Sequence, residues 1–306
     1  MQVDKTIKLI NKYKSLNPLQ KKQIIFALKN NEKREPVSNE TLILRYLHLE
    51  NDISKLVNLF CLLFNMDAYK ECYAYFYNCK DKKDQEILKD LRNIKAKTSK
   101  LNFVDDLLTQ TDFIYYNIQK YNCQSLMDFG CGNGSKTLQL KKLLNIDTVI
   151  GIDIENWDQK LVRNDTQLNI FLYDKDKMNF PIINPVDLIT CIHVLHHIEK
   201  NKLKKIIQYF YDSLKNDGYL VIFEHDVIYE SDFILVDLEH YYFEWLNKNP
   251  FHQNYNMHYF NFFEIIHMFR KKFKFLKSIM FERHVLTNKY TKPNMSRLYI
   301  FQKKSI

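Results

Sequence analysis

The sequence predicts two parts: an all-helical N-terminal region, then an α/β domain built on a mostly parallel sheet. Residues 1–98 contain no glycine, and their apolar residues recur at helical spacing. After residue 99, short apolar runs alternate with helical segments. This alternation is typical of a parallel sheet that is covered on both faces. We therefore predict a domain boundary between residues 98 and 99.

Composition limits the class of protein. The chain has 306 residues, of which 46% are hydrophobic and 14% aromatic, so it can bury sizeable cores and is not intrinsically disordered. No run of 18 or more uncharged apolar residues occurs, and residues 1–5 do not resemble a secretory signal. The six cysteines form no CxxC pair. We expect reduced thiols, a cytoplasmic location and no membrane contact.

The positive charge belongs to the first third of the chain. Residues 1–100 hold 20 basic and 12 acidic side chains, whereas residues 101–306 hold 25 and 24. A basic helical region can guide RNA or another anionic substrate. However, 38 of the 45 basic residues are lysine, which an AT-rich genome or a solvated lysine-rich surface would explain equally well.

Apolar runs predict seven strands in the second part. Five of them have the continuous hydrophobicity of buried parallel strands, at residues 125–128, 148–153, 168–172, 186–191 and 219–223. Two further strands are predicted at residues 275–281 and 297–301, joined by a polar loop that contains Pro293. Helical patterns precede and separate the strands, at residues 105–121, 138–144 and 203–214.

Three of the five glycines alternate in the sequence Asp-Phe-Gly-Cys-Gly-Asn-Gly of residues 128–134. This segment follows a predicted strand and precedes a helix, so its backbone can turn sharply and admit a ligand closely. The helix start beyond it supplies unpaired N–H groups. Asp153, at the end of the second strand, can bind both hydroxyls of a ribose. Together they predict a nucleoside cofactor, with an ordinary strand-to-helix turn as the alternative.

Four segments, in order, resemble the motifs of class I S-adenosylmethionine-dependent methyltransferases. Residues 128–134 resemble the first motif, and Gly151-Ile152-Asp153 resembles the second, whose acid binds the ribose. Residues 186–198 resemble the fourth motif in the group that includes ubiquinone-biosynthesis methyltransferases. Residues 214–220 resemble the turn into the fifth strand, with Asp217-Gly218 where the family usually has Gly-Gly. The resemblance covers residues 100–306.

The resemblance implies a Rossmann-like, seven-stranded methyltransferase sheet with an antiparallel last strand. It also implies an active enzyme that uses S-adenosyl-L-methionine and methylates an O or N nucleophile. Tyr173-Asp174 matches the position of an adenine contact more loosely. The implied cofactor-binding residues are Asp128, Gly130, Cys131, Gly132, Asn133, Gly134, Asp153, Ile154 and Asp174.

Candidate catalytic residues follow the fourth and fifth strands, at the edge where open α/β sheets bind ligands. His193 is best placed to face the methyl group. Glu224 and His225 form a plausible proton acceptor, in which a carboxylate orients an imidazole. A surface turn with ionic contacts is the alternative for Glu224 and His225.

We predict no metal site after the fourth strand. Cys191, His193, His196 and His197 could be drawn as zinc ligands, but strand-to-helix geometry would scatter their side chains. His196 and His197 are expected to pack at, or cap, the start of the following helix.

The acceptor is less well defined. Residues 191–194 lack the Asn/Asp-Pro-Pro-aromatic tetrapeptide of enzymes that methylate exocyclic amines of bases, and the Pro-Cys of cytosine-C5 enzymes. They also lack the aspartate that ribose 2′-O enzymes need here. Methylation of the cap guanine at N7 requires none of these signatures. Residues 241–263 are rich in aromatic side chains that could form a cap over a substrate pocket or close a core; Asp237, His240 and Tyr241 could line the same cleft. We favour a viral-type or RNA-directed enzyme. A small-molecule methyltransferase and a catalytically inactive scaffold protein are the alternatives.

Overall fold

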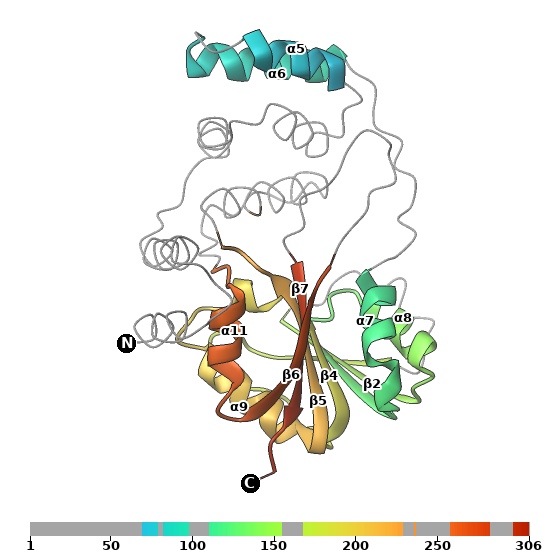
Figure 1. Ribbon diagram of the computed structural model, residues 1–306. Helices are drawn as coiled ribbons and strands as arrows, with labels where there is room; N and C mark the ends of the chain where they lie inside the picture. The colour runs from blue at the N-terminus through green and yellow to red at the C-terminus, as the bar shows by residue number, and fades with distance from the viewer. Residues whose placement is uncertain are drawn as a thin grey trace.

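The computed structural model describes residues 69–78, 82–97, 110–154, 168–228, 236, 258–281 and 296–305 (Figure 1). In the N-terminal region, α5 (Tyr69–Asn78) and α6 (Asp84–Lys97) are helices that pack against each other. Both helices lie within the predicted helical domain of residues 1–98, which as a whole stays a prediction. The remainder of that prediction, and the boundary after residue 98, lie outside the described residues. None of the described helices is both long and apolar enough to cross a membrane.

A seven-stranded mixed sheet forms the centre of the second part (Figure 1), as predicted. Its strands are β1 (Ser125–Phe129), β2 (Thr148–Asp153), β3 (Leu168–Leu172), β4 (Val186–Ile192), β5 (Leu214–His225), β6 (Phe273–Met280) and β7 (Ser296–Lys303). They are arranged in the order β3-β2-β1-β4-β5-β7-β6. Strands β1 to β5 pair in parallel, whereas β7 is antiparallel to both β5 and β6.

Helices cover both faces of the sheet (Figure 1). One face carries α7 (Gln110–Ile118), η1 (Gln119–Tyr121) and α8 (Ser135–Leu144); the other carries η3 (Leu195–His197), α9 (Leu203–Ser213) and α11 (Phe262–Phe269). Alternate residues of the strands face opposite layers. On β1, for example, Leu126 belongs to the core under α7 and α8, whereas Met127 belongs to the core under α9 and α11.

The predicted turn before the fifth strand is part of the strand itself. β5 begins at Leu214, which pairs with Val186 before an irregularity in the β4–β5 register. In this segment the residue with a left-handed backbone is Asp217, with φ 61°, whereas Gly218 does not have a positive φ. A Cβ at Gly218 would lie 3.0 Å from the carbonyl oxygen of Lys215, so close packing explains this glycine.

Two other segments refine the predictions. The predicted helix start at His196 and His197 is a separate 3-10 turn, η3, which ends because Ile198 is extended. In the aromatic segment of residues 241–263, Tyr259, Phe260 and Phe263 are buried and close the core. Asp237, His240, Tyr241 and the other aromatics before residue 258 lie outside the described residues.

Candidate active site

The glycine loop between β1 and α8 has a backbone that side chains rarely adopt. Gly130, Gly132 and Gly134 have φ values of 75°, 57° and 80°. A Cβ on Gly130 would also lie 2.2 Å from Val194 Cγ2. The loop is anchored to the neighbouring strand, because Gly130 N donates to the carbonyl of Ile152 across 2.7 Å. Alternating glycines are therefore a requirement of this fold at this turn.

Asp128 secures the base of the loop. Its buried carboxylate accepts hydrogen bonds from Thr190 Oγ1 at 2.7 Å and from Thr137 Oγ1 at 2.5 Å. Burial raises the pKa of Asp128, and the two hydroxyl donors partly oppose the rise. Since Thr137 lies on α8 and Thr190 on β4, Asp128 joins three elements beneath the loop.

A cavity of about 190 Å³ opens on the loop. It is lined by Asp128, Gly130, Cys131, Gly132, Asn133, Lys136 and Ile192. Five of these residues are among the predicted cofactor-binding set. Lys136 was not predicted, although its place in the first turn of the helix after the glycine loop was a usable signal.

Asp153 lies at the end of β2 beside this loop. One carboxylate oxygen accepts from Gly132 N and the other from Ile154 N, both across 2.7 Å. The neighbouring apolar side chains of Ile154 and Leu172 remain 38% and 52% exposed. A held carboxylate beside open apolar groups fits a ribose and the base attached to it. The glycine before it, Gly151, is also required, since its Cβ would lie 2.8 Å from Cys131 Sγ.

Asp174 has a local structural role. Its Oδ1 accepts from Asp176 N at 2.9 Å and from Lys177 N at 3.1 Å, which stabilises the turn after β3. These backbone donors lower the pKa of the exposed carboxyl group. The predicted contact between Asp174 and adenine stays a prediction.

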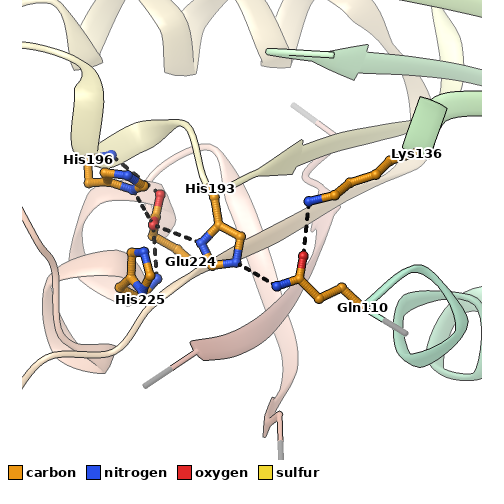
Figure 2. Close-up of polar contacts among 6 residues, drawn as sticks. All are labelled: Gln110, Lys136, His193, His196, Glu224 and His225. Carbon is orange, nitrogen blue, oxygen red and sulfur yellow. Dashed lines mark hydrogen bonds and ion pairs between the residues drawn. The ribbon is translucent and has the colours of Figure 1, made fainter. Parts of the chain in front are cut away.

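The three predicted catalytic residues meet at the ends of β4 and β5 (Figure 2). Ligand-type atoms of His193, Glu224 and His225 all lie within 4.8 Å of one another. His193 has a φ of 55°, which is rare for a residue with a side chain, and its N–H donates to the carbonyl of Phe223 across 2.7 Å. Such strained backbone is concentrated at functional sites.

Glu224 is completely buried and organises the surrounding histidines (Figure 2). Its Oε1 accepts from His196 Nδ1 at 2.5 Å and from His225 N at 2.9 Å, and lies 3.9 Å from His193 Nδ1. Burial raises the pKa of Glu224, and the positive potential and N–H groups of the histidines oppose the rise. His196, which was expected to pack or cap, is therefore a direct partner of Glu224.

The three candidates differ in their access to a ligand. The side chain of His193 is 19% exposed, whereas His225 is buried behind it, with ring centroids 4.6 Å apart. The ring of His225 also contacts those of His196 and Tyr259. Glu224 and His225 can thus position His193. Of these three residues, only His193 has a side chain that is partly exposed to solvent.

Two imidazoles and a carboxylate are also a ligand set for divalent metals. However, Glu224 Oε1 already accepts two hydrogen bonds, including the short one from His196. A metal at this oxygen would have to displace at least one of those donors. The arrangement fits a hydrogen-bonded histidine–carboxylate cluster better than a metal site, and the absence of a metal stays a prediction.

Gln110, the first residue of α7, contacts both Lys136, which lines the cavity, and His193 (Figure 2). Its Oε1 accepts from Lys136 Nζ at 3.0 Å, and its Nε2 lies 3.4 Å from His193 Nε2. Sequence reasoning missed Gln110, because it lies 83 residues before His193 and outside every motif.

A family model described as a methyltransferase domain matches residues 126–218. No curated protein sequence matches the chain.

Many solved structures are similar to the chain. They include the 1,6-didemethyltoxoflavin-N1-methyltransferase of Burkholderia thailandensis, solved with S-adenosylhomocysteine (12% identity, 64% of this chain and 78% of that chain, TM-score 0.46). An S-adenosylmethionine-dependent methyltransferase from Methanosarcina mazei is another (16% identity, 62% and 96%, TM-score 0.45). These likenesses decide nothing about the acceptor.

Proposed function

Because residues 126–218 match a family model described as a methyltransferase domain, we propose that the chain uses S-adenosyl-L-methionine to methylate an O or N nucleophile that loses its proton to His193. The observation that carries this proposal is the position of His193. It stands between the buried Glu224 and the Gln110–Lys136 pair that borders the glycine-loop cavity. A cofactor cavity is thus linked by contacts to a histidine that a buried carboxylate supports.

The residues present fit the cofactor. When bound, S-adenosyl-L-methionine supplies a methyl group already activated on a sulfonium. The glycine loop would hold its methionine portion, Asp153 its ribose and Ile154 its adenine. Asp153 needs little reorganisation for this task, because Gly132 N and Ile154 N already orient its carboxylate.

The chain's own contribution to the reaction is alignment and proton acceptance. Holding two reactants aligned can be worth roughly 7–11 kcal/mol of the barrier. His193 Nε2 takes the acceptor's proton, and Glu224 stabilises the imidazolium that forms at His193. A general base of this kind contributes roughly 10²–10⁴-fold.

The first test is calorimetric titration with S-adenosylhomocysteine. The native protein should bind it, and Asp153→Ala should weaken binding severely because the ribose loses its carboxylate partner. Asp147→Ala is the matched control, since Asp147 is exposed just before the opposite end of β2 and should leave the affinity unchanged. No binding by the native protein would contradict the proposal.

The same samples then enter a tritiated methyl-transfer screen over RNA, protein and metabolite pools. His193→Gln should retain S-adenosylhomocysteine binding and lose roughly 10²–10⁴-fold in transfer, as expected for loss of a general base. Undiminished transfer by His193→Gln would remove His193 from the mechanism.

RNA is a second candidate for the molecule that carries the acceptor. The supporting observation is the excess of 20 basic over 12 acidic side chains in residues 1–100. Such a region can attract a polyanion and raise its local concentration near the methyltransferase domain.

A further inference from the structure

The carboxamide of Gln110 lies between Lys136 Nζ and His193 (Figure 2). Lys136, which lines the glycine-loop cavity, donates to the carboxamide oxygen, and the carboxamide nitrogen approaches His193 Nε2. A single amide group thus contacts a cation at the cofactor site and the proposed proton acceptor.

The hydrogen bonds from Lys136 to Gln110 and from Gln110 to His193 run in one direction. Lys136 can only donate, so the Gln110 oxygen faces it and the NH₂ group faces His193. Because that NH₂ group has no acceptor site, His193 Nε2 must accept. A neutral His193 therefore carries its proton on Nδ1, the nitrogen that faces Glu224.

These two contacts define what a substrate in the place of Gln110 would have to offer. It would keep both contacts if it donated a hydrogen bond to His193 Nε2 and accepted one from Lys136. A ring N–H beside a C=O, the lactam edge, presents the same two atoms as the Gln110 carboxamide. We propose that Gln110 occupies the position of the acceptor's reactive edge and that the acceptor is a lactam. This inference rests on the proposed function and names the substrate class for it.

Lactam chemistry needs both of these residues. The nitrogen lone pair of a lactam is delocalised into the carbonyl, so the nitrogen attacks well only as its N–H is removed. His193 Nε2 takes this proton, and the Lys136 ammonium stabilises the negative charge that collects on oxygen. The nitrogen pair then forms the new N–CH₃ bond, the C–S bond breaks with its electrons on sulfur, and the products are an N-methyl lactam and S-adenosylhomocysteine.

Simpler nucleophiles match the site less well. An amine or an alcohol could donate to His193 in place of Gln110. It has no carbonyl oxygen, however, to accept the hydrogen bond that Lys136 now donates to Gln110. A hydrogen bond to a charged group contributes roughly 1.5–3 kcal/mol, which corresponds to about 10–100-fold in rate or affinity. The site should discriminate by this factor in favour of a lactam.

Lactam edges occur on free heterocycles and on nucleobases in RNA, so the test includes both. The full-length protein is assayed with tritiated S-adenosylmethionine and 2-quinolone, uridine, inosine or short single-stranded RNAs that contain these bases. Matched controls are the N-methylated lactams, aniline and benzyl alcohol. At least one lactam should be methylated on nitrogen, and transfer to every control should be at least about tenfold slower.

Variants test the two contacts separately. Lys136→Met should lower kcat/KM for the lactam by about 10–100-fold, because its charge is lost. Lys142→Met, a change of an exposed lysine in the last turn of the same helix, should have no such effect. Gln110→Ala should lower the KM for the lactam several-fold, since the competing amide is gone, without changing the affinity for S-adenosylhomocysteine.

A spectroscopic readout requires no substrate. Nitrogen-15 NMR of histidine-labelled protein, assigned with His193→Gln, should show neutral His193 protonated on Nδ1. Gln110→Glu should move this proton to Nε2, because a carboxylate can only accept there.

Protonation of His193 on Nε2 in the native protein would overturn the proposal. So would a panel without a methylated lactam, or equal effects of Lys136→Met and Lys142→Met. Failure to bind S-adenosylhomocysteine would instead contradict the proposed function itself.

Discussion

Gly130 combines two constraints that its neighbour Gly132 does not share. Both residues have left-handed backbones, but a Cβ at Gly130 would overlap Val194, whereas a Cβ at Gly132 would meet nothing within 4 Å. Val194 follows the strained His193 at the end of β4. The glycine loop therefore packs closely, at Gly130, against the segment that carries His193 and Val194.

Substitution of these two glycines should separate backbone strain from overpacking. Gly132→Ala should lower the free energy of unfolding by about 1–2 kcal/mol, the cost of a left-handed backbone with a side chain. Gly130→Ala should cost about 1–3 kcal/mol more, because its methyl group must displace Val194. Urea unfolding measures both values, and equal losses would contradict the packing argument.

At the scale of elements, the buried carboxylate of Asp226 joins the end of β5 to β7 and α11. Asp226, just after β5, accepts from Arg297 Nε of β7 at 2.6 Å and from Phe262 N of α11 at 2.8 Å. Asp226 follows directly after Glu224 and His225. Its contacts with Arg297 and Phe262 therefore help to hold the strand end that carries them.

Removal of one partner of the Asp226–Arg297 ion pair should be costly. Arg297→Gln should reduce the free energy of unfolding by about 3 kcal/mol, because it leaves the Asp226 carboxylate buried without its cation. Glu199→Gln, which removes the charge of the exposed Glu199 in its pair with Lys202, is the control and should cost much less, because solvent screens an exposed pair. Similar losses in urea unfolding would show that burial does not distinguish the two pairs.

The elements themselves were largely predictable. Apolar runs placed all seven strands. The signal is clearest for the central strands β1 and β4, because parallel strands buried on both faces are continuously hydrophobic. The errors lay at boundaries that long-range pairing decides. β5 starts earlier than its apolar run because Leu214 pairs with Val186, and η3 breaks off before α9.

At the scale of the whole molecule, charge and chemistry are distributed unequally. The basic excess lies in residues 1–100, whereas the glycine loop and the histidine cluster lie beyond residue 127. If the acceptor belongs to RNA, residues 1–100 attract the RNA and the part of the chain beyond them carries out methyl transfer.

RNA binding should accordingly depend steeply on salt. Fluorescence anisotropy of labelled RNA should show affinity falling linearly with salt concentration on a log–log scale, as counterions are released. Deletion of residues 1–97 should flatten this slope. Unchanged S-adenosylhomocysteine binding by the shortened chain is the necessary control. An unchanged slope would favour a small-molecule acceptor.

The sequence by itself predicted the seven-stranded sheet and the loop where we propose that the cofactor binds. Strand periodicity and the glycine loop depend on residues that are neighbours in the chain, so a linear motif is enough to identify them. It also selected His193, Glu224 and His225, because parallel strands bring their carboxyl ends to one edge.

The tertiary structure decided how these residues are arranged at that edge. It buried Glu224 against His196, put His225 behind His193, and brought Gln110 and Lys136 to the open side. These contacts depend on strand register and on how α7 and α8 pack over the sheet. Because they join residues far apart in the chain, no local sequence pattern predicts them.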